Sequence, residues 1–340
     1  MKSEVKMYEL KLVNPFGISR STRTSHTVVF LEVDNEFRGE ASPYPYYGES
    51  IEGTIDIIEK AMEKIEGEDF FTIEWIMDEL KKKFTLKGTG SAMAAIDMML
   101  FDFSAKKSNL PLYKFLGYRH PEKKQTSFTI GIDSVDKMLK KVDDAAEHPI
   151  LKIKLGRDVE QDLMVMKEIR KRTDKTIRVD ANGGWTPENA LRCINLLADL
   201  GIEYVEQPLV KGSFEELKKL KKNSPLPIFL DEDILVSNDI IKVLDCCDGI
   251  NIKLMKCGGI LEARRMISIA KSFGLKIMLG CMIESSLSVT AAAHLSSAVD
   301  YLDLDGNLLV ANDPFDGMHL VNTFITLPNR NGIGVIPKNN

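Results

Sequence analysis

The stretch that decides the fold is residues 151–182, LKIKLGRDVEQDLMVMKEIRKRTDKTIRVDAN. It contains two short apolar runs, Leu151–Leu155 and Ile177–Asp180, with a longer amphipathic segment between them. Short apolar strands that alternate with amphipathic helices are typical of βα units, whose strands pair in parallel. The stretch therefore predicts one strand–helix–strand unit of a parallel sheet.

The same alternation starts at about Ser127 and continues beyond this stretch. The further strands that we expect are Phe128–Ile132, Tyr204–Glu206, Ile228–Asp231, Gly249–Leu254, Lys276–Gly280 and Tyr301–Leu304. One of the helices between them should have Thr186 as its N-cap and Pro187 at its first position. Eight units in one run favour a (β/α)8 barrel over an open sheet. The last unit is weaker, which leaves a seven-stranded variant open.

Residues 1–117 have a different predicted pattern of secondary structure, in which strands come first and helices follow. The pattern predicts strands at Met7–Val13 and Thr27–Val33, helices at Ile51–Ile65, Glu74–Lys83 and Ala92–Ala105, and Ser91 as the N-cap of the last helix. The fold class is therefore α/β, with a barrel at residues 118–319 after an α+β domain at residues 1–117.

The composition is that of a soluble globular protein. Of the 340 residues, 44% are hydrophobic and 28% are charged. The net charge of -5 does not indicate the basic surface that nucleic-acid binding requires. There is no apolar run of membrane-spanning length. The five cysteines form no CxxC pair, so we expect reduced thiols in a cytoplasmic protein.

Acidic residues end three consecutive strands of the predicted barrel: Asp180, Glu206 and Asp231. Catalytic groups of such barrels lie at the carboxyl ends of the strands, so these side chains should converge near the barrel axis. Three carboxylates without a His or Cys partner make an all-oxygen site that suits Mg²⁺. The alternative is three separate acids that cap helices or form salt bridges.

Lysines end strands on both sides of these acids. Lys152 and Lys154 are two residues apart and share a strand face, as do Asp303 and Asp305 at the last strand. Lys154 and Lys253 would flank a bound cation from opposite sides. Nearby positive charge disfavours an ammonium group, so we expect a lowered lysine pKa suited to a general base. A solvated strand end is the alternative for any one of these residues.

At these residues the chain resembles the muconate-lactonizing subgroup of the enolase superfamily. The resemblance rests on KxK at Lys152–Lys154, VDANGGW around Asp180, VEQP around Glu206, Asp231, and NIKLMK around Lys253. It extends from PFGISR near the N-terminus through GEASP to the final GIGVI. It implies a modified (β/α)8 TIM barrel under an α+β capping domain, to which residues 320–340 return.

Within the superfamily, Asp303-Leu304-Asp305-Gly306 resembles the dipeptide epimerases, in which two acids hold the substrate's α-ammonium group. The resemblance implies acid/base roles for Lys154 and Lys253, Mg²⁺ ligation by Asp180, Glu206 and Asp231, a carboxylate contact for Lys152, and a dipeptide-lining role for Thr129, Cys281, Met282 and Ile283. The chain departs from the family at Asp233, usually Ser, and at Gly183, commonly Gln.

The implied reaction is inversion of the α-carbon of a dipeptide's C-terminal residue by two lysines, through an ene-diolate. The alternatives are an o-succinylbenzoate synthase-type lyase and a non-enzymatic protein that has kept the fold. Arg20 and Arg23 lie on a loop that closes over the substrate in relatives, where a basic residue pairs with a glutamate side chain. Either arginine would suit L-Ala-D/L-Glu and cell-wall peptide turnover, whereas Tyr44–Tyr47 would suit an apolar residue. A homo-oligomer is compatible with this family.

Overall fold

An eight-stranded parallel sheet forms the barrel in the computed structural model, which describes residues 2–85 and 87–338. Its strands are β4 (Phe128–Ile130), β5 (Ile150–Lys154), β6 (Thr176–Asp180), β7 (Val205–Glu206), β8 (Ile228–Leu230), β9 (Gly249–Lys253), β10 (Lys276–Gly280) and β11 (Tyr301–Asp303). They follow one another in chain order across the sheet. The Ser127 N–H donates to the Leu302 carbonyl at 3.1 Å, which brings the two edges together. All eight predicted strands are confirmed, so the barrel is not the seven-stranded variant.

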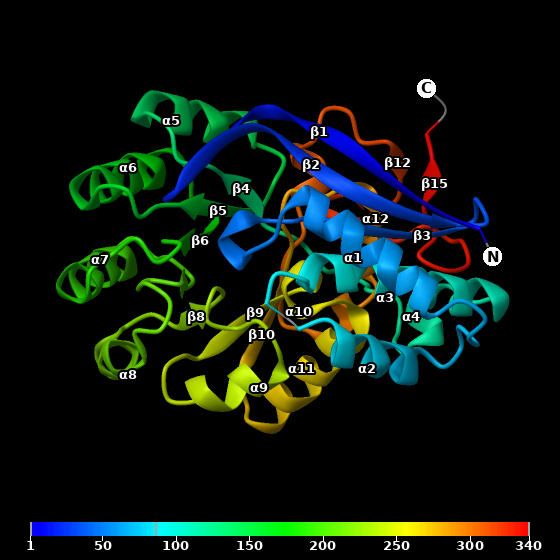
Figure 1. Cartoon of the computed structure of the whole chain (residues 1–340). Coiled ribbons are helices and arrows are strands. Elements are labelled where there is room, and N and C mark those ends of the chain that lie inside the picture. Colours follow the sequence, from blue (N-terminus) through cyan, green and yellow to red (C-terminus); the bar gives the residue numbers. More distant parts are fainter. Residues whose placement is uncertain (1, 86, 339–340) are drawn as a thin grey trace.

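Helices cover the outside of the barrel (Figure 1). They are α5 (Val135–Asp144), α6 (Val159–Arg172), α7 (Pro187–Asp199), α8 (Phe214–Asn223), α9 (Ser237–Ile240), α10 (Leu254–Cys257), α11 (Ile260–Ser272) and α12 (Ser286–Ala293), with 3₁₀ turns at Ile241–Val243, Ser296–Ala298 and Gly306–Leu309. The predicted start of α7 is confirmed, because the Thr186 side chain accepts the Asn189 N–H and Pro187 opens the helix. Its buried residues follow the helical period and face the sheet: Ala190, Cys193, Ile194 and Leu197.

The N-terminal part is a three-stranded antiparallel sheet packed on helices. The strands are β1 (Ser3–Ile18), β2 (Ser21–Val33) and β3 (Phe37–Ala41), and the helices are a 3₁₀ turn at Pro45–Tyr47, α1 (Ile51–Lys64), α2 (Ile73–Lys83), α3 (Gly90–Lys107) and α4 (Leu112–Phe115). Gly39 of β3 lies against α3 so closely that a Cβ there would meet the Ala95 carbonyl oxygen at 1.8 Å. This contact explains why a glycine occupies the strand.

One predicted boundary in this part is wrong. Helix α3 begins at Gly90, and Thr89 is its N-cap rather than Ser91. The Thr89 carbonyl already accepts the Met93 N–H at 2.9 Å, so the first turn forms before Ser91. The Ser91 N–H is instead satisfied by the buried carboxylate of Glu49 at 2.8 Å. Ser91 is the second residue of the helix, so Glu49 supplies the acceptor that an N-cap hydroxyl ordinarily supplies to this N–H.

The last segment of the chain packs on both parts. Its strands are β12 (Phe315–Asp316), which pairs with β15 (Ile336–Pro337), and β13 (His319–Val321), which pairs with β14 (Phe324–Thr326). The Gly332 N–H donates to Leu110 at 2.9 Å, and its carbonyl accepts the Leu112 N–H at 2.8 Å. The end of the described chain thus lies against the turn between α3 and α4.

The β1–β2 hairpin extends over the end of the barrel where the parallel strands finish (Figure 1). Its tip is held there by hydrogen bonds from Ser19 and Arg20 to the Asn182 carbonyl, at 3.3 Å and 2.7 Å. Arg157, after β5, donates to the carbonyls of Ile18 and Ser21, each at 3.0 Å. The hairpin therefore closes the strand ends on which the candidate site lies. Within the described ranges, no helix combines the length and the hydropathy that crossing a membrane requires.

Candidate active site

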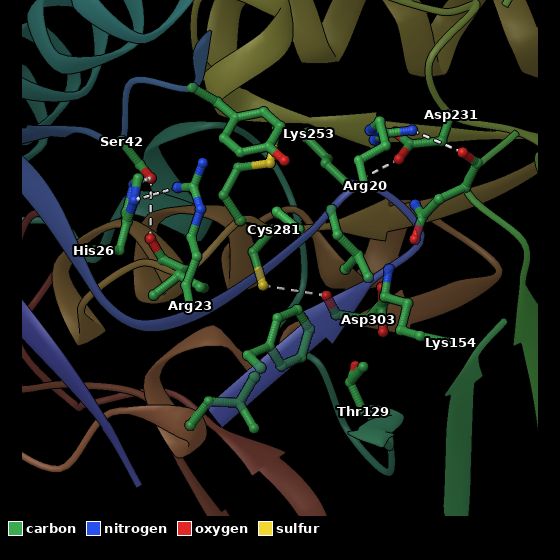
Figure 2. Close-up of a pocket in the computed structure, with 18 of the residues that line it drawn as sticks. Arg20, Arg23, His26, Ser42, Thr129, Lys154, Asp231, Lys253, Cys281 and Asp303 are labelled. Atoms are coloured by element: carbon green, nitrogen blue, oxygen red, sulfur yellow. Dashed lines mark hydrogen bonds and ion pairs between the residues drawn. The ribbon is translucent and has the colours of Figure 1, made fainter. Parts of the chain in front are cut away.

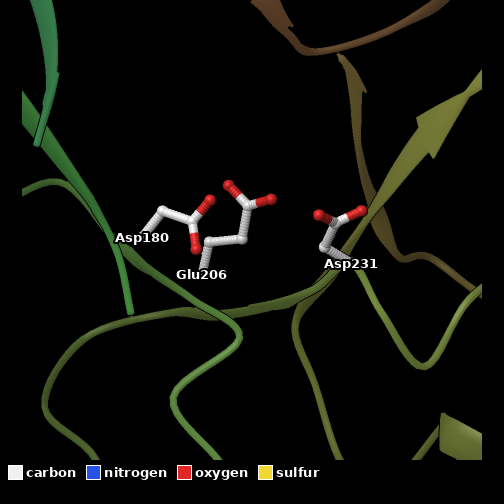
Figure 3. A group of neighbouring side chains, drawn as sticks. All are labelled: Asp180, Glu206 and Asp231. Atoms are coloured by element: carbon white, nitrogen blue, oxygen red, sulfur yellow. The ribbon is translucent and has the colours of Figure 1, made fainter. Parts of the chain in front are cut away.

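The three predicted metal ligands meet at the strand ends. Asp180 and Glu206 are register partners at the ends of β6 and β7, and Asp231 directly follows β8. One carboxylate oxygen from each lies within 4.8 Å of the others, and all three residues are buried (Figure 3). An all-oxygen set of this kind fits Mg²⁺, which binds through carboxylates and completes its shell with water or substrate. The residues present therefore fit the implied metal.

The electrostatics of the three carboxylates differ. Burial, followed by repulsion from Asp180, raises the pKa of Glu206 to about 7. Burial also acts to raise the pKa of Asp231, but Lys253 and Lys256 outweigh it and hold that pKa well below its usual range. Three buried carboxylates so close together need compensating charge, which the surrounding lysines supply.

Lys154 and Lys253 lie on opposite sides of the acids. The Lys154 ammonium group is 2.5 Å from Asp180, and the Lys253 ammonium group is 2.8 Å from Asp231. Burial acts to lower the pKa of Lys253, but Asp231 and Glu206 outweigh it and raise the pKa above its ordinary value. Contact with these carboxylates therefore determines the direction of the shift at Lys253, which is opposite to the expected lowering.

Two further lysines lie deeper. Lys152 is fully buried, with its ammonium group 2.6 Å from Glu206 and 2.5 Å from Asp303. Lys256, which sequence reasoning missed, contacts the Asp231 carboxylate and donates to the Asp231 carbonyl at 2.6 Å. The signal for Lys256 was its place three residues after Lys253, because the short helix α10 turns that position back toward Asp231.

Asp303 and Asp305 are both buried, but their partners and their pKa shifts differ. Asp303 accepts from Lys152 at 2.5 Å and from Ser127, and Lys152 outweighs burial to lower the pKa of Asp303 to about 2. Asp305 accepts the Thr129 N–H at 2.6 Å, and burial followed by repulsion from Asp303 raises the pKa of Asp305 to about 6. Lys152 therefore balances the charge of Asp303, whereas it forms no ion pair with Asp305 among the described residues.

A cavity opens above these groups, beneath the hairpin (Figure 2). The predicted residues that line it are Lys154, Asp231, Lys253, Asp303, Asp305, Thr129, Cys281, Met282, Ile283, Arg20 and Arg23. Asp180, Glu206 and Lys152 are not among the lining residues and lie below its floor. The polar lining residues that sequence reasoning did not select include His26, Ser42, Asn182 and Glu232.

The two arginines of the hairpin have different partners. Arg20 forms an ion pair with the buried Glu232 at 2.8 Å and lies over the Tyr46 ring at 4.3 Å. Arg23 lies over the Tyr44 ring at 4.5 Å and is hydrogen-bonded to His26 at 3.0 Å. In the part of the chain that the structure describes, Arg23 makes no ion pair.

The two departures from the family pattern have structural explanations. Asp233 accepts from the Gln207 side chain at 2.7 Å and from the Gly212 N–H at 2.8 Å, so it fixes the loop after β7. Gly183 has a φ of +71°, and a Cβ there would lie 3.2 Å from the Leu209 carbonyl oxygen. A left-handed backbone beside this neighbour favours glycine over glutamine.

Comparison with known proteins agrees with the geometry. An L-Ala-D/L-Glu epimerase from Bacteroides thetaiotaomicron is 40% identical and covers 99% of this chain and 88% of its own. The substrate-liganded L-Ala-D/L-Glu epimerase from Bacillus subtilis superposes with a TM-score of 0.93 at 32% identity, over 99% of this chain and 98% of that one. The dipeptide epimerase from Enterococcus faecalis, in complex with Mg and L-Leu-L-Tyr, superposes with a TM-score of 0.92 at 33% identity, over 98% of each chain.

Two family models cover nearly the whole sequence. Residues 2–117 match the N-terminal domain of the mandelate racemase / muconate lactonizing enzyme family, and residues 135–340 match the enolase C-terminal domain-like model. The strands that carry the three acids and the two cavity lysines all fall within the second match. The chain therefore belongs to the mandelate racemase / muconate lactonizing enzyme family of the enolase superfamily.

Proposed function

We propose that this protein is a Mg²⁺-dependent dipeptide epimerase, an isomerase that inverts the α-carbon of the C-terminal residue of a dipeptide. The observation that carries the proposal is one cavity with two lysines on opposite sides of three carboxylates, beside a buried pair of acids. Relatives named as dipeptide epimerases cover the same length of chain, which supports the reaction class.

Asp180, Glu206 and Asp231 would hold the Mg²⁺ ion. The bound ion supplies positive charge to the substrate carboxylate and so stabilises the negative charge that develops when the α-proton leaves. Asn182 donates its N–H to Asp180 at 2.8 Å, and Lys256 holds Asp231, so both outer ligands are kept in place. We assign Lys152 to the part of the site that receives the substrate carboxylate. There its ammonium group balances the negative charge of Glu206.

Lys154 and Lys253 would carry the proton transfers. They belong to β5 and β9, which face each other across the strand ends of β6, β7 and β8. One lysine removes the α-proton from one face, and the other returns a proton to the opposite face, which inverts the centre. Two lysines on two faces are what a 1,1-proton transfer requires, whereas a lyase needs an acid at its leaving group.

Asp303 and Asp305 would bind the α-ammonium group of the dipeptide. Both are buried and line the cavity, and Lys152 neutralises only the first. A buried pair with one unbalanced negative charge favours a cationic substrate group. Substrates of the lyase alternative lack that ammonium group, so this pair argues against the lyase.

Arg23 would bind the side chain of the C-terminal residue. Its guanidinium group is free of carboxylate partners in the described chain, whereas that of Arg20 is paired with Glu232. Arginine binds carboxylates through two parallel N–H groups, so we propose an acidic residue, as in L-Ala-D/L-Glu. We assign Arg20 to closure of the hairpin over the substrate. Thr129, Cys281, Met282 and Ile283 would line the rest of the dipeptide.

The decisive experiment measures the incorporation of solvent deuterium into dipeptides. L-Ala-X and X-Y pools are incubated with the enzyme and Mg²⁺ in D₂O, and a gain of one mass unit at a dipeptide reports exchange at the α-carbon. We expect the gain to be largest for L-Ala-L-Glu. The Asp180→Ala variant is the control, because its weakened Mg²⁺ binding should greatly reduce the exchange. If no dipeptide gains mass although the enzyme binds Mg²⁺, the epimerase function is refuted, and lyase substrates should be tested next.

The proposal includes a cytoplasmic location. The five cysteines are free in the structure, and four of them are buried, as expected for a protein of a reducing compartment. Self-association stays a prediction from the family.

A further inference from the structure

Three side chains beside the cavity form a continuous hydrogen-bonded chain (Figure 2). Arg23 Nη1 lies 3.0 Å from His26 Nδ1, and His26 Nε2 lies 2.8 Å from Ser42 Oγ. Ser42 Oγ in turn donates to the Ile283 carbonyl at 2.9 Å. The chain joins β2, the loop after β3 and the loop after β10, so it ties the hairpin to the wall of the cavity.

The direction of every hydrogen bond in this chain is determined by chemistry. A guanidinium group can only donate, so His26 Nδ1 must accept from Arg23. His26 Nε2 then carries the ring proton and donates to Ser42, whose hydroxyl is left to donate to Ile283. Each donor meets one acceptor, and the imidazole is neutral. Burial, followed by the charge of Arg23, lowers the pKa of His26 to about 4, which agrees with the neutral form.

A neutral partner orients an arginine without cancelling its charge. The buried Glu232 takes up the charge of Arg20, whereas the imidazole of His26 takes up none of the charge of Arg23. Only one of the five N–H donors of Arg23 is used by His26, and the Tyr44 ring supports the guanidinium plane at 4.5 Å. The remaining donors leave room for the two parallel hydrogen bonds of a carboxylate.

We propose that His26 and Ser42 are positioning residues that hold Arg23 as an unneutralised cation for an anionic side chain on the C-terminal residue of the substrate. This inference rests on the proposed epimerase function and deepens it, because it names the residues that select the substrate class. Pre-organisation is the reason: an arginine that is already oriented loses less freedom when it binds.

The test compares two substrates of equal size, L-Ala-L-Glu and L-Ala-L-Gln, which differ by one charge. The readout is the ratio of their kcat/KM values, with the ratio of their Kd values from calorimetry as a measurement that needs no turnover. In His26→Leu, which keeps bulk but removes both hydrogen bonds, we expect the preference for Glu to fall about tenfold, mainly through KM. Ser42→Ala should shift the ratio in the same direction by a smaller factor.

Two further variants separate positioning from general structural damage. His26→Asn keeps an acceptor near the place of Nδ1 and should restore part of the preference for Glu. Arg20→Met should weaken both substrates together and leave their ratio unchanged. The inference is overturned if His26→Leu keeps the full preference for Glu, or if it weakens both dipeptides by the same factor.

The outcome for the wild-type enzyme distinguishes the two proposals. If it exchanges no α-hydrogen in any dipeptide, the epimerase function fails. If it epimerises apolar dipeptides and discriminates against L-Ala-L-Glu in both rate and binding, the function stands and the inference about His26 and Ser42 fails.

Discussion

Replacing Arg20 by methionine tests whether this side chain holds the hairpin closed. In the structure its guanidinium group is 2.8 Å from Glu232 and donates to the Asn182 carbonyl at 2.7 Å. Methionine keeps the aliphatic bulk and removes both interactions. The side chain of Glu232 is only 2% exposed and that of Arg20 is 31% exposed, so the acid is left buried while water can reach the former position of the arginine.

The expected loss follows from these two exposures. Removing one partner of a fully buried ion pair costs about 3–5 kcal/mol, and an exposed pair contributes about 0–1 kcal/mol. Arg20 is about one-third exposed, and Asn182 still donates to Glu232 at 3.3 Å. We therefore expect a loss of about 2–3 kcal/mol, or a fall in Tm of roughly 3–4 °C for a chain of this size, at an unfolding entropy of about 2.1 cal/mol/K per residue.

The assay is a double-mutant cycle with Arg20→Met and Glu232→Gln, read by differential scanning calorimetry. We expect a coupling energy of about 1–2 kcal/mol between the two positions. Arg157→Met is the matched control, because Arg157 binds the same hairpin through neutral acceptors only. Its effect should add to that of Glu232→Gln. Additive effects of Arg20→Met and Glu232→Gln would refute the closure role.

Four more predictions concern the reaction and the fold. Lys154→Ala and Lys253→Ala should each lower epimerisation by at least about 10²-fold, yet each should still exchange the α-hydrogen of one epimer in D₂O, as seen by proton NMR. Asp180→Ala should weaken Mg²⁺ binding in calorimetry more than the roughly 10–100-fold that outer-shell changes cause. Asp305→Asn should reduce the preference for free over N-acetylated dipeptides about tenfold or more in kcat/KM, because a charge-assisted contact is lost. Burial lowers the pKa of His294 to about 4, so its contribution to stability is present above pH 6.5 and is lost as the pH falls toward 4. In acid titrations of unfolding, His294→Gln should reduce the slope by at most about 1.4 kcal/mol per pH unit, and the equal contribution of His26 should remain.

The barrel and its acidic cluster were predictable because both depend on local patterns. Strand length, helical period and the residue at each strand end are all visible in a short window of sequence. Parallel strands in chain order then place those ends side by side. Asp180, Glu206 and Asp231 therefore meet in the structure as the pattern predicted.

Features that depend on distant partners were not predictable in this way. Ser91 looks like a good N-cap, but it lies inside the helix, where the carboxylate of Glu49, 42 residues away, accepts its N–H. Lys256 looks like an ordinary helix lysine, yet it is fully buried against Asp231. In both cases the partner comes from another element. A local signal existed only for Lys256, from its place three residues after Lys253.

The choice between Arg20 and Arg23, on which the proposed specificity rests, also depends on a partner that is distant in the sequence. The two arginines are three residues apart, and His26 follows Arg23 by three residues, but nothing near Arg20 in the sequence indicates its partner. Their roles diverge because Glu232, 212 residues away, neutralises Arg20, whereas His26 binds Arg23 and leaves its charge intact. A neutral residue in place of Glu232 would free Arg20, and an acid in place of His26 would pair with Arg23, in each case without altering a metal ligand or a lysine. Changes of this kind would alter the accepted dipeptide and leave the metal ligands and lysines as they are; solved structures that this chain resembles include both an L-Ala-D/L-Glu epimerase and a dipeptide epimerase in complex with L-Leu-L-Tyr.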